Sequence, residues 1–384
     1  MPEAARGLSV ALHRRGNTVD VATTDVLAPG VRLTRPIADL EGPKILRSRV
    51  LSLQLAESFE LYVCPRQALV SSNFLDSYDA VHFHGARGFQ NAVWAPRLRR
   101  DGVPCVMQPH GSLPYVGANQ GAKRLYDALI GRQLVKTYDK VAALSVNEAS
   151  CFPSFGIKSE KTALLPNGID RADFRDLPTR GALRDELAIS DDELVFTFLG
   201  RINKIKGLDI LAPAFDLAAR RLSGQKLRLI IAGPPSDFAS QLSELVIRSQ
   251  TPEKIVVLGV VSGKRKLQLL IDTDWLVVPS HYEVFSLAVL EAAMVGVPAI
   301  LSRASSFTEF ADQDAALVSD PNPISYSKAI EFAVRNPELR NDFGRKARSL
   351  TLESFTWDLI APRAENIYRE IATSQSRIPN CILG

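Results

Sequence analysis

The chain has 384 residues, of which 46% are hydrophobic and 23% are charged, and its formal net charge is +4. This length exceeds the size at which one hydrophobic core usually stops growing, so two domains are expected. No apolar run approaches the length of a membrane-spanning helix, and the first residues contain no apolar signal core, so we expect neither a membrane span nor export. The four cysteines lack zinc-site or disulfide spacing, which favours the reducing cytoplasm.

The first half of the chain alternates helices and strands in the manner of a parallel sheet. A helix at 2–15 ends at Gly16, and a short strand follows at 18–23. Residues 25–65 are rich in proline and irregular, and we assign no element there. The later elements are a strand at 80–83, a helix at 88–100, a strand at 103–107, a helix at 121–137, a strand at 140–145, a helix at 147–153 and a strand at 161–165.

The second half begins after the turn sequence PNGID at 166–170, where we place the link between two domains. Two α/β halves of similar size predict a ligand cleft at the carboxyl ends of their strands. The predicted elements are strands at 194–199, 227–231, 254–258, 275–278 and 297–301, and helices at 206–221, 236–248, 264–272, 286–295, 323–335, 338–350 and 356–373.

The segment PSHYEVFSLAVLEAAMVGVP at 279–298 contains two isolated carboxylates. Glu283 and Glu291 are the only full charges between Asp274 and Arg303. Glu283 is expected in the loop that follows a strand, and Glu291 two turns along the next helix. A carboxylate in apolar surroundings is unfavourable without a partner, so both are expected to meet a ligand or buried donors. The alternative is that Glu291 lies on a solvent edge and Glu283 is an ordinary loop residue.

The same segment offers backbone donors at the start of its helix. The amides of Ser286 and Leu287 should point out of the helix N-terminus, an arrangement that suits phosphate oxygens. Hydroxyl acceptors beside an anion site suit a nucleotide-linked sugar.

A basic loop follows the strand at 194–199, in the sequence GRINKIKG. Arg201, Lys204 and Lys206 lie where the strand ends, so they could neutralise a diphosphate leaving group. A solvated loop would explain the same pattern. The spacing matches neither the phosphate-binding P-loop nor the dinucleotide-binding glycine motif.

Histidines also lie at strand ends. His82 and His84 occur in VHFHGARG, and His110 occurs in QPHGSLPY. The adjacent glycines allow a ligand to approach the backbone closely. For His82 the structural reading, a buried or capping histidine, is favoured.

The predicted helix at 121–137 carries basic residues beside leucines at core-like spacing. Its basic face suits an anionic membrane surface or, equally, a solvated flank. Nucleic acid is disfavoured because no aromatic residues interleave the basic ones. The basic residues are Lys123, Arg124, Arg132, Lys136 and Lys140, and the leucines expected to face the core are Leu125, Leu129 and Leu134.

Several segments together resemble the retaining glycosyltransferases of family four, which have two glutamates separated by seven residues in the second half of a GT-B fold. The resemblance covers nearly the whole chain. It lies in GRINKIKG, IAGPPSD, the run from VVLGVVSG to VGVPAI that contains PSHYEVFSLAVLEAA, PHGSLPY, LLPNGID and FTWDLIAPRAENIYREI.

The resemblance implies an α/β GT-B fold, with two doubly wound Rossmann-like domains facing across a cleft. Residues 1–172, with a returning helix at 355–384, would form the acceptor-side domain. Residues 173–354 would form the nucleotide-sugar-binding domain.

The resemblance also implies roles for particular residues. Glu283 would contact hydroxyls of the donor sugar, and Glu291 would contact the ribose. Arg201 and Lys206 would hold the diphosphate, assisted by the backbone of Ser286 and Leu287. His110 would face the reaction centre. No cofactor or metal ion is implied, because the basic loop would stabilise the departing nucleotide.

Two features depart from the family pattern. Ser286 stands where the family usually has glycine; serine retains the amide and is a good helix cap. The family also opens with a strand and a Gly-Gly loop ahead of a helix such as PEAARGLSVALHRRG, and both are missing here. That strand would be central in the first sheet, so its loss should leave two neighbouring strands unpaired and the protein unstable, defective in donor binding or wrongly begun. We expect Met1 to be an internal start.

The leading hypothesis is a cytoplasmic glycosyltransferase that acts on a lipid-linked acceptor in surface or exported polysaccharide synthesis, with peripheral contact on the inner face of the membrane. One alternative keeps the chemistry with a soluble acceptor. Another is a sugar-nucleotide-binding protein that has lost catalysis.

Overall fold

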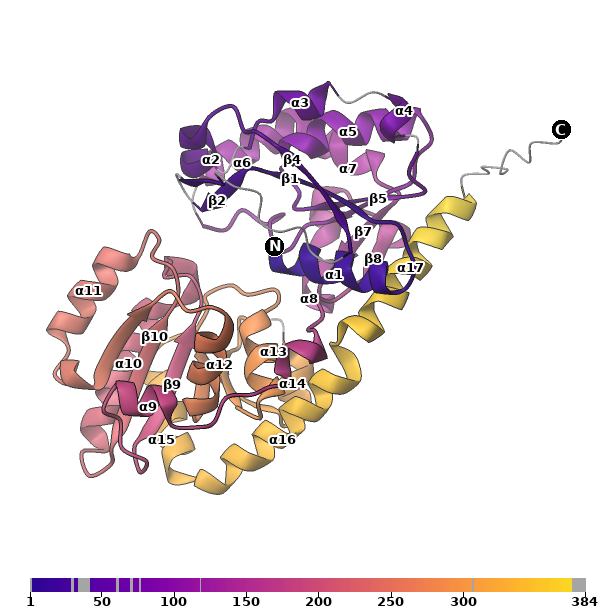
Figure 1. Cartoon of the computed structure of the whole chain (residues 1–384). Coiled ribbons are helices and arrows are strands. Elements are labelled where there is room, and N and C mark those ends of the chain that lie inside the picture. The colour runs from indigo at the N-terminus through magenta and orange to yellow at the C-terminus, as the bar shows by residue number, and fades with distance from the viewer. Residues whose placement is uncertain are drawn as a thin grey trace. The chain divides into compact units, whose positions relative to one another are not determined.

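The computed structural model describes residues 2–28, 31–33, 42–59, 62–69, 72–75, 77–117, 119–305 and 307–374 (Figure 1). The chain divides into two compact units. The first comprises Met1–Gly168 with Trp357–Gly384, and the second comprises Ile169–Thr356. From the sequence we place the same two divisions at 172/173 and 354/355.

The first unit contains a parallel four-stranded sheet. Its strand order is β5 (Val81–His84), β6 (Cys105–Gln108), β7 (Lys140–Ala143) and β8 (Thr162–Leu164). A separate parallel pair is formed by β1 (Asp20–Thr24) and β4 (Lys44–Ser48). Among the described strands β1 pairs with β4 alone and β5 with β6 alone. The four-stranded sheet and the β1–β4 pair are therefore separate. This agrees with the prediction from the sequence that a central strand is missing from this unit.

The stretch 25–65, for which no element was predicted, contains regular structure. β2 (Val26–Ala28) pairs antiparallel with β3 (Val31–Arg32), and β4 and helix α2 (Leu53–Phe59) follow. The short strands escape prediction because a few residues give no periodic pattern. The rest of the stretch lies partly outside the described residues.

Helix α17 (Trp357–Ser374) packs on helix α1 (Pro2–Arg14) in the first unit (Figure 1). Both are amphipathic, and their apolar faces bury Leu8, Leu12 and Ile360 against β6 and β7. Glu365 of α17 accepts hydrogen bonds from Arg15 and Asn17, each at 2.8 Å. Helix α17 is thereby fastened to the segment that follows α1.

Further helices of this unit are α3 (Pro65–Ala68), α4 (Ser72–Leu75), α5 (Phe89–Arg100) and α8 (Val146–Cys151).

The predicted helix at 121–137 is interrupted. α6 (Gln120–Tyr126) and α7 (Arg132–Thr137) are joined by a π-helical turn, Asp127–Gly131. Leu125 and Leu129 share one face of a regular helix, but Leu134 is nine residues from Leu125 and lies about half a turn away from it. Leu134 is buried, but Leu125 and Leu129 are 62% and 70% exposed. The prediction that all three leucines face the core is wrong for these two.

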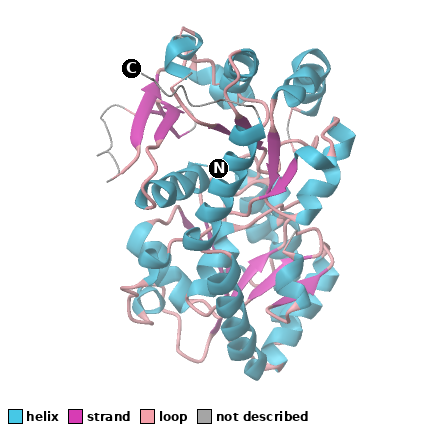
Figure 2. Cartoon of the chain, turned by 90° about the vertical axis from the view of Figure 1, so that its right-hand side faces the viewer, coloured by secondary structure: helices cyan, strands magenta, loops and turns pink. Residues whose placement is uncertain are grey.

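The second unit contains a six-stranded parallel sheet in the order β11-β10-β9-β12-β13-β14. This is a doubly wound order, whose direction of winding reverses between β9 and β12. Helices cover the sheet on both faces (Figure 2). Beneath them, each face of the sheet has its own apolar core. The strands are β9 (Leu194–Leu199), β10 (Leu227–Ala232), β11 (Ile255–Gly259), β12 (Trp275–Val278), β13 (Ala299–Ser302) and β14 (Ala316–Ser319).

Most helices of the second unit lie within a few residues of their predicted positions, but β14 and two short helices were not predicted. The predicted ones are α10 (Leu208–Arg221), α11 (Ala239–Arg248), α12 (Gly263–Asp272), α13 (Leu287–Met294), α15 (Pro323–Arg335) and α16 (Pro337–Ser354), and the short additions are α9 (Ala182–Glu186) and α14 (Thr308–Asp312).

A buried ionic network fastens α9 to the sheet beside β12. Asp274 accepts hydrogen bonds from Arg180 at 2.9 Å, from Arg184 at 2.7 Å and from the amide of Val195 at 2.8 Å, and it also pairs with Arg340. Both Asp274 and Arg184 are almost fully buried. Because each charge is paired and hydrogen-bonded, the network is tolerated inside the protein.

Candidate functional site

The candidate site in the second unit lies at the carboxyl end of β12, next to the reversal of the sheet. β12 is buried along its whole length and ends at Val278, whose carbonyl accepts a hydrogen bond from the Tyr326 hydroxyl at 2.9 Å. The loop Pro279–Ser286 follows, and α13 begins at Leu287. Open α/β sheets bind ligands at such a reversal.

Main-chain contacts join this loop to the basic loop after β9. The His281 amide donates to the Ile205 carbonyl at 2.8 Å. Gly207 has φ +76°, and a Cβ at that position would lie 2.1 Å from the Pro279 carbonyl oxygen. Only glycine allows the two backbones to approach so closely. Asn203 accepts the Lys206 amide at 3.1 Å, which caps the short turn that presents Lys206.

Lys206 and Glu283 form an ion pair across the two loops. Glu283 is only 6% exposed, and the Ser280 hydroxyl lies 3.4 Å from its Oε2 atom. Glu283 is therefore not the solvated loop residue of the alternative interpretation. Its charge has a protein partner, which the sequence did not reveal. A buried carboxylate held by one lysine can exchange that partner for a ligand's hydroxyl groups.

The N-terminus of α13 lies directly beyond this pair in the chain. Ser286 is the buried N-cap residue, but its side chain makes no capping hydrogen bond, contrary to the expectation that serine caps this helix. Among the described residues, no backbone carbonyl accepts a hydrogen bond from the amide of Ser286 or of Leu287. Phe285 packs on Phe307 and Phe355, which fixes the entry to the helix. The end of α13 therefore presents open donors to an anion.

Glu291 lies farther along α13. Its Oε1 atom is 2.7 Å from the Lys266 ammonium of α12, and a fifth of its side chain is exposed. Lys266 was not predicted as a site residue, because a lysine on an amphipathic helix does not indicate which carboxylate it will contact. Glu291 is thus neither isolated nor turned fully to solvent.

Arg201 and Lys204 are exposed in the loop after β9. In the part of the chain that the structure describes, no carboxylate pairs with Arg201. The loop leaves the sheet beside Gly233, where a Cβ would lie 1.9 Å from the Gly200 carbonyl oxygen. Arg201 is therefore held at the strand end with its charge available for an anion.

His110 lies in the first unit, in the loop after β6. Its backbone has φ +51°, an uncommon value for a residue other than glycine. Its Nε2 atom lies 2.8 Å from Nδ1 of His84 on β5. Burial keeps the pKa of His110 well below its usual value and lowers the pKa of His84 to about 4, so both rings are neutral at neutral pH.

Glu148 fixes the backbone next to His110. Its carboxylate accepts the Gly111 amide at 2.5 Å and the Leu144 amide at 2.7 Å. Burial raises the pKa of this carboxyl, and the two amides act in the opposite direction. Glu148 was not predicted as a site residue, although Ser145 followed by Glu148 is the sequence signature of a helix capping box. Ser145 accepts the Glu148 amide as in that motif, but the Glu148 carboxylate accepts the amides of Leu144 and Gly111 instead of that of Ser145.

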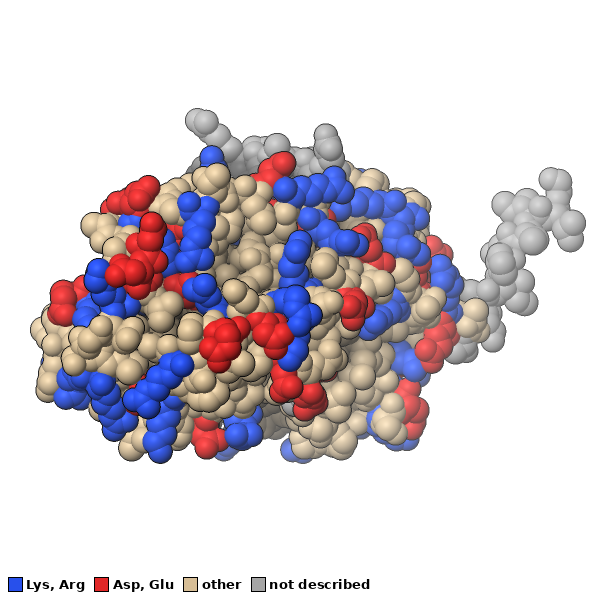
Figure 3. All heavy atoms as spheres, turned by 90° about the horizontal axis from the view of Figure 1, so that it is seen from below, with Lys and Arg blue, Asp and Glu red and all other residues tan. Residues whose placement is uncertain are grey.

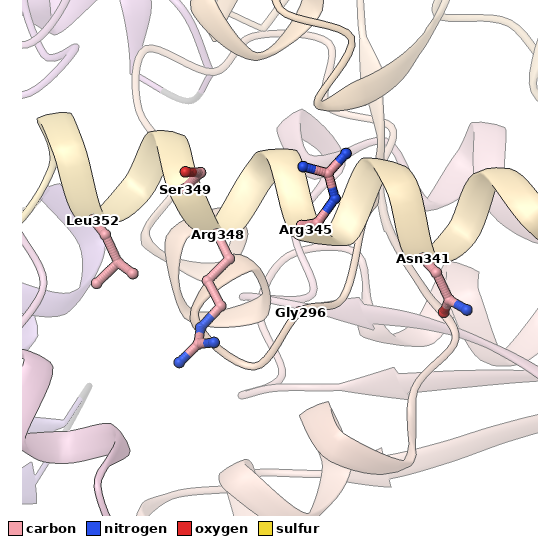
Figure 4. Close-up of a pocket in the computed structure, with 6 residues that line it drawn as sticks. All are labelled: Gly296, Asn341, Arg345, Arg348, Ser349 and Leu352. Atoms are coloured by element: carbon pink, nitrogen blue, oxygen red, sulfur yellow. The ribbon is translucent and has the colours of Figure 1, made fainter.

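A surface hollow elsewhere in the second unit is not part of this site. It lies along α16 and beside Gly296, which follows the C-terminal end of α13 (Figure 4). The open amides lie at the opposite end of that helix. The lining residues are Gly296, Asn341, Arg345, Arg348, Ser349 and Leu352.

The described residues contain neither a metal-binding cluster nor a membrane-spanning helix. No group of three or more His, Cys, Asp or Glu side chains there is arranged to hold a metal ion. No described helix combines the length and apolar character needed to span a bilayer. On the face shown in Figure 3, basic and acidic side chains are interspersed, so that face offers no continuous basic track for a nucleic-acid backbone.

The two Rossmann-like units and the site at the end of β12 define a glycosyltransferase of the GT-B fold. The family model of Glycosyltransferase Family 4 matches residues 4–173, and that of Glycosyl transferases group 1 matches residues 179–350. The chain belongs to the group 1 glycosyltransferases.

Similar proteins agree with this assignment. The D-inositol 3-phosphate glycosyltransferase of Saccharomonospora viridis is 28% identical over 381 residues, which cover 96% of this chain and 86% of that protein. Sucrose-phosphate synthase from Thermosynechococcus elongatus has a similar fold, with a TM-score of 0.79 at 20% identity, covering 96% of this chain and 93% of that one. Anabaena HepE in complex with UDP-glucose gives a TM-score of 0.67 at 17% identity, covering 85% and 86%.

Proposed function

We propose that the protein transfers a sugar from a nucleotide-diphosphate sugar to a hydroxyl acceptor, with retention at the anomeric carbon and without a metal ion. The observation that carries this proposal is the partly buried Lys206–Glu283 pair, which joins the loop after β9 to the loop that leads to the open amides of α13. This arrangement supplies a cation, an anion and neutral donors to one ligand. A nucleotide sugar presents the matching diphosphate and hydroxyl groups, and the UDP-glucose complex of HepE supports that donor class.

The diphosphate would bind the positive elements of the site. The amides of Ser286 and Leu287 would donate to phosphate oxygens, and Lys206 and Arg201 would offset their charge. Negative charge grows on the leaving nucleotide as the bond to the sugar breaks. These donors are already in place, so they stabilise that charge with little reorganisation.

Glu283 and Lys206 would exchange partners when the donor binds. Lys206 would turn to the diphosphate, and the Glu283 carboxylate would accept hydrogen bonds from the sugar hydroxyls. Each charge then keeps a partner, which matters because an unpaired buried charge is strongly unfavourable. Glu291, oriented by Lys266, would accept hydrogen bonds from the ribose. His110 would act at the reaction centre as a neutral ring.

Enzyme assays with a panel of nucleotide sugars test this proposal. We expect donor hydrolysis or transfer by the wild type, a large loss in Glu283→Gln with nucleotide binding retained, and no inhibition by a metal chelator. Product NMR should show the anomeric configuration of the donor. If the wild type and Glu283→Gln are equally inactive but still bind nucleotide, the result would instead support a sugar-nucleotide-binding protein that lacks catalysis.

For the acceptor we propose a lipid-linked glycan, used in surface or exported polysaccharide synthesis at the cytoplasmic face of a membrane. The supporting observation is that Leu125 and Leu129 are largely exposed on the basic stretch 120–137. Exposed leucines among basic residues suit the interface of an anionic bilayer. Arg124 and Arg132 have no carboxylate partner within the described ranges.

Co-sedimentation with liposomes tests the membrane contact. We expect binding that increases with anionic lipid and that is weakened in the double variant Leu125→Ser with Leu129→Ser. Ile247→Ser provides a matched control, because Ile247 is equally exposed but lies on α11 of the second unit. Binding that does not depend on anionic lipid would contradict this part of the proposal.

A soluble acceptor is the second candidate. It is supported by the names of the relatives, since one is named for D-inositol 3-phosphate and a structural neighbour is a sucrose-phosphate synthase. Transfer to small hydroxyl compounds in the absence of lipid would favour this candidate over the lipid-linked one.

A further inference from the structure

Three histidine rings form a row in the first unit. The rings of His82 and His84, both on β5, are stacked with centroids 4.5 Å apart. His84 meets His110 edge to edge, with centroids 5.1 Å apart and an angle of 26° between the rings. The Nδ1 atom of His84 also lies within hydrogen-bond distance of Nε2 of His110. The proposed function uses His110 alone and leaves His84 without a role.

We propose that His84 is a positioning residue that fixes the ring orientation and the tautomer of His110. This inference rests on the proposed function, in which His110 acts at the reaction centre. His84 itself would touch neither the donor nor the acceptor. It would act only through the ring of His110.

The hydrogen bond constrains the tautomer because both rings are neutral. A neutral imidazole has one nitrogen with a proton and one without. If His84 Nδ1 donates, His110 Nε2 must accept, and the His110 proton is on Nδ1. If His110 Nε2 donates, its Nδ1 is left without a proton. In either case the bond couples the two rings, so the tautomer of His84 determines whether the free nitrogen of His110 is a donor or an acceptor.

The contacts that hold the backbone of His110 do not restrain its ring, so the ring needs a support of its own. Its left-handed conformation is held by Glu148 through the Gly111 amide, so the backbone and the ring have separate supports. Glu148 fixes where the loop lies, but it does not determine the rotation of the His110 ring. His84 supplies that second restraint by its in-plane hydrogen bond to the ring.

The row is anchored at its other end. His82 Nδ1 lies 2.7 Å from the Tyr368 hydroxyl of α17, while His82 Nε2 is buried with no hydrogen-bond partner among the described residues. Burial raises the pKa of Tyr368, so its hydroxyl keeps its proton. His82 therefore supports the ring of His84 by stacking but has no hydrogen bond to His110, which makes it a suitable control.

NMR of the full chain with ¹⁵N-labelled histidine tests the inference, since the two ring nitrogens resonate at separate positions according to which one carries the proton. We expect one tautomer of His110 in the wild type and a mixture in His84→Phe, which keeps a planar ring at this position and loses the hydrogen bond. His84→Asn, whose amide lies at the position of Nδ1 and can restore the bond, should recover the single tautomer. His82→Phe should leave it unchanged.

Kinetics supply the second readout. His84→Phe should lower kcat about tenfold, as expected for one neutral hydrogen bond, with the donor KM nearly unchanged. His84→Asn should recover most of kcat. An unchanged His110 tautomer in His84→Phe, or a restored tautomer in His84→Asn without recovery of kcat, would overturn the inference. Full activity of His110→Ala is a separate result that would overturn the proposed role of His110 itself, and with it the effect of His84 on activity.

Discussion

Gly207 and Pro279 are in direct main-chain contact, at a distance that leaves no room for a Cβ atom on residue 207. The two residues belong to different loops, one after β9 and the other after β12. Their contact, with the hydrogen bond between His281 and Ile205, joins the loop that carries Lys206 to the loop that carries Glu283. The geometry of the ion pair is therefore set by the backbone.

Replacement of Gly207 should disturb both loops at once. Gly207→Ala introduces a Cβ in a left-handed conformation and against a carbonyl oxygen, so we expect a loss of stability of at least about 2 kcal/mol and weaker binding of nucleoside diphosphates. Chemical denaturation and calorimetric titration measure the two effects. Gly224→Ala is the matched control, because a Cβ there meets no atom within 4 Å. Equal effects of the two substitutions on stability and binding would show that the contact between Gly207 and Pro279 is not what makes Gly207 necessary.

The Lys206–Glu283 pair allows a double-mutant cycle. Lys206→Met or Glu283→Gln alone leaves one charge unpaired, and we expect each to lower the free energy of unfolding by about 2 kcal/mol, less than for a fully buried pair because Lys206 is 26% exposed. The double variant should regain stability but not activity. Additive losses of stability in the double variant would contradict the pairing.

The network around Asp274 should dominate the stability of the second unit near α9. Asp274→Asn leaves Arg184 buried without its carboxylate, so we expect a loss of about 3 kcal/mol in the free energy of unfolding. Denaturant titration of the two proteins gives this difference. Asp320→Asn removes an exposed partner of Arg303 and should change stability by less than about 0.5 kcal/mol. A similar value for both variants would be evidence against the network.

Acid should weaken the contact between α1 and α17. The hydrogen bond from Arg15, with a further one from Asn17, lowers the pKa of Glu365 to about 2, against a usual value of 4.5. The lowered pKa means that this contribution is complete above about pH 4.5 and is lost as the pH falls toward 2. Melting temperatures of the wild type and Glu365→Gln should therefore converge across that window.

The matched control for the acid experiment is Glu3→Gln, at the exposed start of α1. Its melting temperature should follow that of the wild type at every pH. A constant difference between the wild type and Glu365→Gln from neutral pH to pH 2 would contradict the assignment.

Much of the second unit could be predicted from the sequence. Strand 275–278 and the helix after Ser286 are apolar runs of distinct length, and each was found within a residue or so of its predicted position. The same pattern made Glu283 conspicuous, because one charge in an apolar segment stands out. Burial of that carboxylate followed from the position of the loop at the end of a central strand.

The partners of these charges could not be predicted. Lys206 and Lys266 meet Glu283 and Glu291 through contacts between residues far apart in the chain, and no periodicity encodes such pairs. The exposure of Leu125 and Leu129 was missed for a different reason. These two leucines share one face of the helix, but Leu134 is nine residues from Leu125 and lies about half a turn away, so the three could not all face one core.

The main-chain bond from His281 to Ile205 also restricts how the length of these loops can change. An insertion or deletion in one loop would shift its backbone past the other and break the register at Gly207 and Pro279. A compensating change of length in the second loop would be needed to restore it. Substitution of the exposed side chain of Lys204 carries no such requirement, so this is a position at which a library of variants can explore new donors while the frame is kept.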